Sequence, residues 1–117
     1  ITFRHFGNGQ VASESTIQKQ ILNWLKSEGF WAVKIMQCNK NGTPDILACI
    51  AGVFVGIEVK FTGKIKNVSK IQQYQIEAIE SSGGSAFATD SLSHCQNEIR
   101  RRFKNGYELH KMPEKNG

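Results

Sequence analysis

The chain has 117 residues and a formal net charge of +5 at neutral pH. This length allows one hydrophobic core and excludes a second full-sized domain, so we predict a single domain over residues 1–117. The positive charge favours an acidic partner, and nucleic acid fits better than a membrane because no long basic amphipathic helix is evident. No run is apolar enough to span a bilayer and the start lacks a signal-peptide pattern, so we expect a cytoplasmic protein that is not secreted.

The cysteines and histidines argue against a disulfide framework or a zinc site. The cysteines are odd in number and lie far apart, which fits reduced thiols in a cytosolic protein. The histidines are equally scattered, so we expect surface or hydrogen-bonded core histidines rather than metal ligands. These residues are Cys38, Cys49, Cys95, His5, His94 and His110.

The first helix is predicted between residues 13 and 29, after an N-terminal arm of residues 1–12 that could include a short strand. Ser13 is the expected N-cap and Gly29 the expected end. Glu14 falls on the inward stripe of this helix, where a carboxylate needs a partner. The alternative is that Glu14 only complements the helix dipole. The apolar stripe consists of Ile17, Ile21, Leu22 and Leu25.

Three strands are predicted next, and the second and third form a hairpin. Residues 30–36 are aromatic and branched, and residues 39–42 turn the chain toward a second strand. The apolar runs 46–50 and 53–59 meet at Ala51-Gly52. If the turn is centred there, Asp45 lies directly opposite Glu58, with Cβ atoms about 4.5–5.5 Å apart, and Lys60 lies on the same face as Glu58.

The same register gathers apolar side chains on the other face of the hairpin, which supports it independently. Two opposed carboxylates destabilise a hairpin, so the arrangement asks for a cation. Lys60 supplies part of it, and a hard divalent ion such as Mg²⁺ would supply more. The alternative is a solvated face whose charges have no role. The apolar set is Ile46, Ala48, Ile50, Val53, Val55, Ile57 and Val59.

A basic loop over residues 61–68 leads into a second helix, which Ser69 caps and which runs to Ser82 before Gly83-Gly84. Ser69 and Gln72 form a capping-box pattern, in which the Gln72 amide reaches back to the backbone of Ser69. Gln72 also heads the inward stripe of this helix, so it could instead contact a phosphate or a water at the Asp45–Glu58 site.

Residues 85–89 predict a fourth strand, and Asp90 or Ser91 begins a last helix with Leu92, Cys95, Ile99 and Phe103 on one side. The tail from residue 104 is polar and basic, with a possible short strand around residues 107–109. The predicted order is helix, three strands, helix, strand, helix.

Two groups of basic residues are candidates for DNA binding through phosphates, although such runs are often only solvated surface. One group lies before and after the hairpin, and the other lies at the end of the last helix, where cations also complement the helix dipole. The candidates are Lys40, Lys64, Lys66, Lys70, Arg100 and Arg101.

Several segments together resemble the PD-(D/E)XK nuclease superfamily, and specifically the small stand-alone bacteriophage members of its VRR-NUC branch. The resemblance rests on Glu14, Gly42-Thr43-Pro44-Asp45, Gly56-Ile57-Glu58-Val59-Lys60 and Ser69-Lys70-Ile71-Gln72. It covers about residues 13–90 and implies a restriction-endonuclease-like α/β fold. That fold has an αβββαβ core with a central four-stranded mixed sheet flanked by helices, here followed by a C-terminal helix and tail over residues 91–117.

The resemblance also implies a metal site. Asp45 and Glu58 would ligate Mg²⁺ or Mn²⁺, and the backbone carbonyl of Val59 would complete the protein ligands. Glu14 would contribute through a water molecule. This set makes a divalent metal the expected cofactor.

The implied activity is hydrolysis of a DNA phosphodiester. Lys60 would orient or help activate the attacking water and offset charge on the phosphate, and Gln72 would position water or DNA. The resemblance to members of this branch implies that a homodimer of the chain cuts four-way (Holliday) junctions. The alternatives are a nicking or restriction-like endonuclease on duplex, flap or single-stranded DNA, and a DNA-binding module without catalysis.

Overall fold

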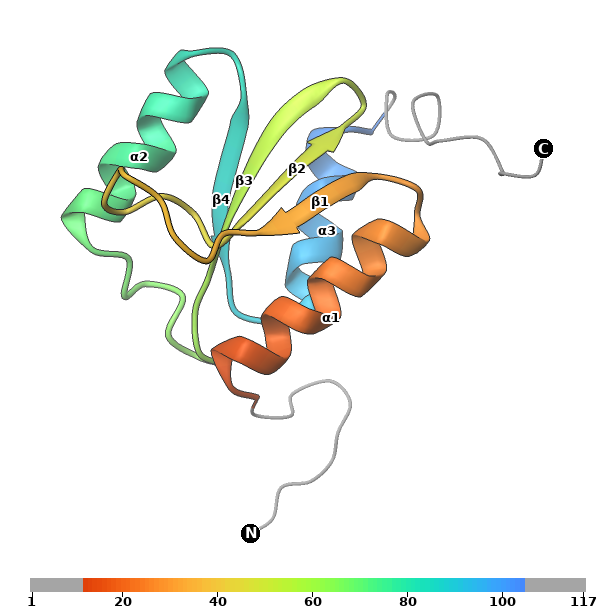
Figure 1. Ribbon diagram of the computed structural model, residues 1–117. Helices are drawn as coiled ribbons and strands as arrows, with labels where there is room; N and C mark the ends of the chain where they lie inside the picture. The colour runs from red at the N-terminus through yellow and green to blue at the C-terminus, as the bar shows by residue number, and fades with distance from the viewer. Residues whose placement is uncertain (1–11, 105–117) are drawn as a thin grey trace, which may run out of the picture.

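The computed structural model describes residues 12–104, and Figure 1 shows their arrangement. The order of helices and strands is the predicted one. The elements are α1 (Glu14–Ser27), β1 (Trp31–Lys34), β2 (Ile46–Ile50), β3 (Val53–Val59), α2 (Lys70–Ser81), β4 (Ser85–Thr89) and α3 (Leu92–Arg102). The predicted N-terminal arm over residues 1–12, except for Ala12, and the predicted strand around residues 107–109 lie outside the described residues.

The strands form one mixed sheet in the order β1-β2-β3-β4. The β1–β2 and β2–β3 pairs are antiparallel, whereas β3 and β4 are parallel and are joined by a crossover through α2. Helix α2 covers one face of the sheet, and α1 and α3 cover the other (Figure 1). The predicted α/β fold class with a four-stranded mixed sheet is therefore confirmed.

The register of the β2–β3 hairpin is the predicted one. Ile46 pairs with Ile57, and Ile50 pairs with Val53 beside the Ala51-Gly52 turn. All the predicted apolar positions on one face are buried except Val53, which is half-buried. Because side chains alternate between faces, the same register directs Asp45 and Glu58 to the opposite face.

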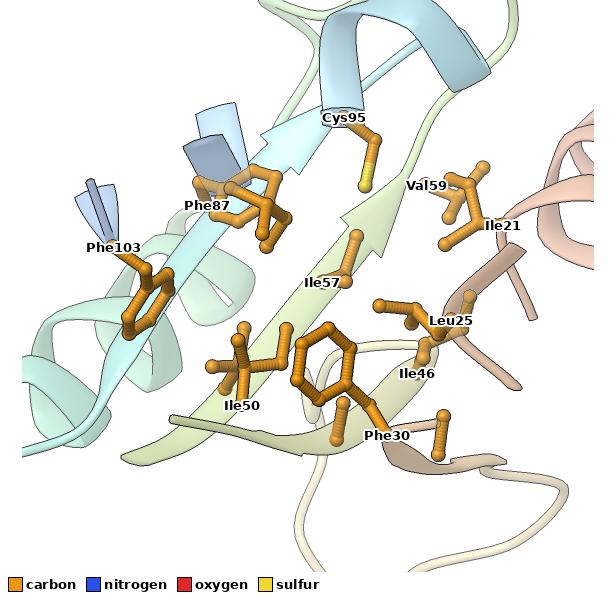
Figure 2. Packing of buried hydrophobic residues seen from close by; sticks show 14 of the residues in the cluster. Ile21, Leu25, Phe30, Ile46, Ile50, Ile57, Val59, Phe87, Cys95 and Phe103 are labelled. Carbon is orange, nitrogen blue, oxygen red and sulfur yellow. The ribbon is translucent and has the colours of Figure 1, made fainter. Parts of the chain in front are cut away.

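The main hydrophobic core lies between the sheet and the helix pair α1 and α3. In Figure 2, Ile21 and Leu25 of α1 point toward Ile57 and Ile46 of the sheet, and Cys95 of α3 packs near Val59. Each of these side chains is completely buried. Burying a side chain of this size contributes about 1.5–3 kcal/mol relative to leaving it exposed, so the hairpin is held by its apolar face.

Serine caps fix where the three helices begin. The side chains of Ser13, Ser69 and Ser91 accept hydrogen bonds from backbone N–H groups in the first turns of α1, α2 and α3. A cap of this kind is worth about 1 kcal/mol. Gly29 follows the end of α1 with φ of +90°, as expected of a glycine after a helix. None of the helices in the described residues is long and apolar enough to cross a membrane.

Strand β1 is shorter than the prediction of residues 30–36. Phe30 is buried in the core before the strand starts, and Met36 is 81% exposed after it ends. Between them, the N–H of Ile35 donates to the carbonyl of Asp45 at 2.8 Å, beyond the last β1–β2 pair. The chain leaves the sheet at this point because residues 36–44 cross toward α2 (Figure 1).

Two glycines allow this face of the sheet to be closely covered. A Cβ at Gly56 would lie 2.9 Å from Cγ of Pro44 and 3.0 Å from Cδ1 of Ile79, so glycine lets the loop and α2 reach the sheet. At Gly42, with φ of +83°, a Cβ would lie 2.7 Å from the carbonyl oxygen of Ile71 in the first turn of α2. The β1–β2 loop therefore contacts the backbone of α2 directly.

This contact predicts a difference between Gly42→Ala and Gly52→Ala. Both glycines have positive φ, but a Cβ at Gly52 has no atom within 4 Å. Gly52→Ala should lose about 1–2 kcal/mol of unfolding free energy, the usual cost of left-handed backbone. Gly42→Ala should lose clearly more, because α2 must also shift, and urea denaturation of the two variants measures both losses. Equal losses would mean that the loop does not constrain α2.

Candidate active site

Asp45 lies where the β1–β2 loop enters β2, after the buried Pro44. Its carboxylate oxygen Oδ2 accepts a hydrogen bond of 2.8 Å from the backbone N–H of Val59. Its backbone carbonyl accepts from Ile35. Asp45 is thus tied to both neighbouring segments of the sheet, and its carboxylate is held against the end of β3 beside Glu58.

Glu58 is a buried carboxyl near the end of β3, only 3% exposed. Burial, and then the charge of Asp45, raises the pKa of Glu58 from 4.5 to about 8, and Lys60 opposes this change only in part. Like charges at short distance in a poorly hydrated place cannot both ionise freely. Asp45 and Glu58 thus lie close enough for their charges to interact, and within the described residues Lys60 offsets this repulsion only in part.

Lys60 lies on the same side as Glu58, as the period of the strand predicts. Its ammonium nitrogen Nζ is 3.7 Å from Oε2 of Glu58, and its side chain is 12% exposed. Its backbone N–H donates to the carbonyl of Thr89 at 2.8 Å, which continues the β3–β4 pairing beyond Val59. The backbone of Lys60 is therefore fixed by β4.

Gln72 forms the predicted capping box and also contacts two residues of the candidate site, whereas its predicted contact with a phosphate or a water stays a prediction. The capping box is present: Gln72 Oε1 accepts from the N–H of Ser69 at 2.9 Å, and its own N–H donates to Ser69 Oγ at 3.2 Å. The same Oε1 accepts from Lys60 Nζ at 2.8 Å, and Nε2 donates to Glu58 Oε2 at 2.9 Å. One amide thus links the start of α2 to the carboxyl and the lysine of the site.

Glu14 is exposed, so the expectation that its carboxylate is aimed into the core is wrong. It is the first residue of α1, and the buried stripe begins almost one turn later with Ile17. Its charge nevertheless contributes to the raised pKa of Glu58. The reason for this proximity is local: the N–H of Ala12 donates to Thr62 Oγ1 at 3.2 Å, which holds the start of α1 beside the chain that leaves β3.

The candidate metal ligands form a pair of carboxyls rather than a larger cluster. Among residues 12–104, no three histidine, cysteine, aspartate or glutamate side chains converge. The metal ligands predicted from the sequence, Asp45, Glu58 and the Val59 carbonyl, with Glu14 through water, therefore stay a prediction.

The six candidate DNA-binding residues lie in two separate regions, and all are exposed. Lys64, Lys66 and Lys70 lie between β3 and the first turn of α2, close in sequence to the site. Lys40 lies in the β1–β2 loop, where its carbonyl accepts from Thr43 Oγ1. This loop lies against the first turn of α2 at Gly42, so Lys40 belongs to the same region as the other three lysines.

Arg100 and Arg101 lie at the other end of the sheet. The neighbouring Arg102 donates to Ser85 Oγ at the start of β4, whereas Lys60 pairs with Thr89 at its end. Arg101 also forms an ion pair with Glu98 at 2.6 Å, and the two arginines at positions 101 and 102 hold the pKa of Glu98 below its ordinary value even though burial opposes this. Part of this positive charge is therefore already compensated.

The sequence interpretation missed the polar contacts at the end of β4. The buried Thr89 hydroxyl lies 2.7 Å from Nδ1 of His94, and Asp90 accepts from the N–H of Gly63. His94 is thus a hydrogen-bonded histidine, as expected. The Gly63–Asp90 contact joins segments 27 residues apart, so local sequence patterns carry no signal for it.

Gln18 of α1 was also missed. Gln18 is buried, whereas Leu22, which was predicted to belong to the apolar stripe, is only half-buried. The spacing could have indicated this burial, because a residue four positions after Glu14 lies on the same side of the helix as Glu14, which was predicted to face the sheet.

Comparison with known proteins identifies the family and the fold. The family model described as archaeal Holliday junction resolvase (Hjc) matches residues 12–111. A solved structure described as a VRR_NUC domain protein is similar over 80% of this chain and 90% of its own, with a TM-score of 0.65 and 21% sequence identity. No curated protein matches significantly. The chain thus has a VRR-NUC-type nuclease fold and belongs to the archaeal Holliday junction resolvase family.

Proposed function

We propose that this nuclease is a divalent-metal-dependent DNA endonuclease that cuts four-way junctions as a homodimer. Membership of the resolvase family supports the nuclease activity and the type of substrate. The observation that carries the chemical proposal is the group formed by Asp45, Glu58, Lys60 and Gln72, which come from three different elements and are linked by hydrogen bonds and close charges.

The donor set fits a hard divalent cation. The carboxyls of Asp45 and Glu58 are held together at a cost, as the raised pKa of Glu58 indicates, and Mg²⁺ or Mn²⁺ prefers carboxylate and carbonyl oxygens. Asp45, Glu58 and the Val59 carbonyl would hold the ion. When bound, the ion would lower the pKa of the attacking water and stabilise developing charge on the phosphate.

The chain contributes a positioned ammonium group. Lys60 has three N–H donors, and it donates one to Gln72 Oε1. Another donor is directed by this anchoring toward the carboxyl pair, where it would orient water or contact a phosphate oxygen. Gln72 keeps Lys60 from closing onto Glu58, because its amide bonds to both side chains.

Glu14 would act from the opposite side of the site. Its exposed carboxylate would accept hydrogen bonds from water, and the Ala12–Thr62 hydrogen bonds keep the start of α1 next to the chain that leaves β3. In this role Glu14 holds water in place rather than binding the ion itself.

The exposed lysines would hold the phosphate backbone near the carboxyl pair, through contacts that position DNA without reading its sequence. The arginines at the end of α3 would touch a more distant part of a branched substrate. The residues proposed for DNA contact are Lys40, Lys64, Lys66, Lys70, Arg100 and Arg101.

An exposed apolar row supports the homodimer. Trp31 pairs with Cys49, and Cys49 pairs with Phe54, so the three side chains cross β1, β2 and β3 in one line. All three are exposed, Trp31 by 60% and Phe54 by 48%. A second copy of the chain is the occupant we propose, because a junction offers two equivalent positions for cutting and a symmetric pair would supply one site for each.

The first prediction concerns cleavage of labelled four-way junction, flap and linear duplex DNA with Mg²⁺, Mn²⁺ or EDTA. We expect paired symmetric cuts in the junction that require metal. Asp45→Asn should cut more than about a hundredfold more slowly, because losing even an outer partner of a metal ligand costs about ten- to a hundredfold. The variant should still bind the junction, because its lysines are unchanged.

Glu77→Gln is the matched control. Glu77 is an exposed acid of α2 that contacts Gln73, so its loss should leave cleavage unchanged. Efficient cutting of flap or duplex DNA would replace the proposal with a nicking or restriction-like endonuclease. Junction binding without cutting in either metal would indicate a DNA-binding module without catalysis.

The second prediction concerns the stability of the metal-free protein. The folded-state pKa of Glu58 is about 8 against 4.5 ordinarily, so the folded protein keeps a proton that the unfolded chain releases. The stability from this proton is complete below about pH 4.5 and is lost as the pH rises through about 8. Glu58→Gln mimics the protonated carboxyl, so in EDTA its Tm advantage over the unchanged protein should grow between about pH 5 and pH 8.

Added Mg²⁺ or Mn²⁺ should reverse this order. The ion stabilises the unchanged protein by binding its folded form, whereas Glu58→Gln lacks one of the two carboxylates. Thermal unfolding with and without metal measures both effects. A Tm difference that stays constant with pH would mean that Glu58 does not titrate in this range.

The third prediction concerns the dimer. Trp31→Glu places a charge in the apolar row and should convert the protein to monomers in sedimentation velocity. Tyr74→Glu is the control, because Tyr74 is equally exposed, at 64%, but lies on α2. If the two variants sediment alike, the second copy does not bind at this row.

A further inference from the structure

Gln18 has the one buried side-chain oxygen or nitrogen in residues 12–104 that lacks a hydrogen-bond partner. The residue is 8% exposed, and the atom concerned is the amide oxygen Oε1. A buried acceptor without a donor loses its hydrogen bonds to water and gains none in return. Such an atom calls for an explanation, and a ligand that supplies the missing donor is one.

Gln18 lies one helical turn after Glu14, the residue of α1 whose charge acts on Glu58. It lies four residues after Glu14 on the same side of α1, between the apolar residues that face the sheet. Side chains on a helix lean toward its N-terminus, so Gln18 covers the turn that Glu14 begins. That turn lies beside the end of β3, as the bond from Ala12 to Thr62 and Figure 1 both indicate.

The chemistry of a hydrated cation matches an amide oxygen. Water bound to a divalent ion presents only O–H donors, so the surrounding protein must supply acceptors. Glu14 is one acceptor at this side of the site, and its charge already acts on Glu58. An amide oxygen adds a second acceptor without adding a third negative charge close to Asp45 and Glu58.

We propose that Gln18 is a positioning residue of the active site, whose amide oxygen accepts a hydrogen bond from the water shell of the divalent ion held by Asp45 and Glu58. This inference rests on the proposed metal-dependent function. It assigns Gln18 a role together with Glu14 in fixing water on the α1 side of the site. The burial of its amide then serves the site rather than the fold.

The test compares Gln18→Met with Gln20→Met. Methionine has the length of glutamine, suits a helix and has no strong acceptor. Gln20 lies on the same helix but is exposed, so it controls for the change of residue type. The measurements are the Tm in EDTA, the affinity for Mn²⁺ without DNA from the signal of free Mn²⁺ in electron paramagnetic resonance, and the single-turnover rate of junction cleavage.

For Gln18→Met we expect a Tm in EDTA that is equal to or above that of the unchanged protein, because the orphaned oxygen is gone. Its affinity for Mn²⁺ should fall about ten- to a hundredfold, the usual effect of removing an outer partner of a metal site. The cleavage rate should fall with it and recover in part at high metal concentration. Gln20→Met should change none of the three measurements.

A second variant, Gln18→Glu, retains an acceptor at the same place and should bind Mn²⁺ at least as tightly as the unchanged protein. A lower Tm of Gln18→Met in EDTA, or an unchanged affinity for Mn²⁺, would overturn the role of Gln18. So would an equal loss of affinity in both variants at this position. If the unchanged protein itself binds no Mn²⁺, it is the proposed metal-dependent function that fails.

Discussion

The pairing of β2 with β3 is the constraint on which the fold and the site both depend. In this register the apolar side chains, such as those of Ile46 and Ile57, point into the core, and the acidic side chains point to the other face of the sheet. A shift of one residue would expose the apolar face and bury the acidic one, so the free energy of the core excludes it. The hydrophobic core thus supplies the energy that keeps Asp45 next to Glu58, although the two carboxyls repel each other.

Gln72 has two structural uses: its amide caps α2, and the same amide contacts Lys60 and Glu58 of the candidate site. The start of the helix is therefore connected directly to Lys60 and Glu58. Gly42 contributes from a third segment, because the β1–β2 loop lies against the backbone of the same turn. The loop before Asp45 and the turn that contains Gln72 form one unit, which limits how far the site can open.

The sequence predicts the parts of this structure that depend on local patterns. Period-two alternation gave the hairpin register, serine and glycine signals gave the helix ends, and the resemblance identified the nuclease fold, whereas the assigned roles of the site residues remain predictions. The sequence could not place Glu14 at the surface, because periodicity gives the side of a helix but not where the sheet beneath it ends. It also could not show that the capping amide of Gln72 reaches Lys60 and Glu58, or find the orphaned amide of Gln18, since both depend on how distant segments pack.

The parallel pairing of β3 with β4 has a consequence for synthesis of the protein. The backbone of Lys60 is fixed by Thr89, and the strand that carries Thr89 is made only after the loop and α2. A chain still growing on the ribosome therefore holds both acidic residues and the lysine before it has the strand that fixes them. The backbone of Lys60 can therefore be fixed only after residues 85–89 have been made and have paired with β3.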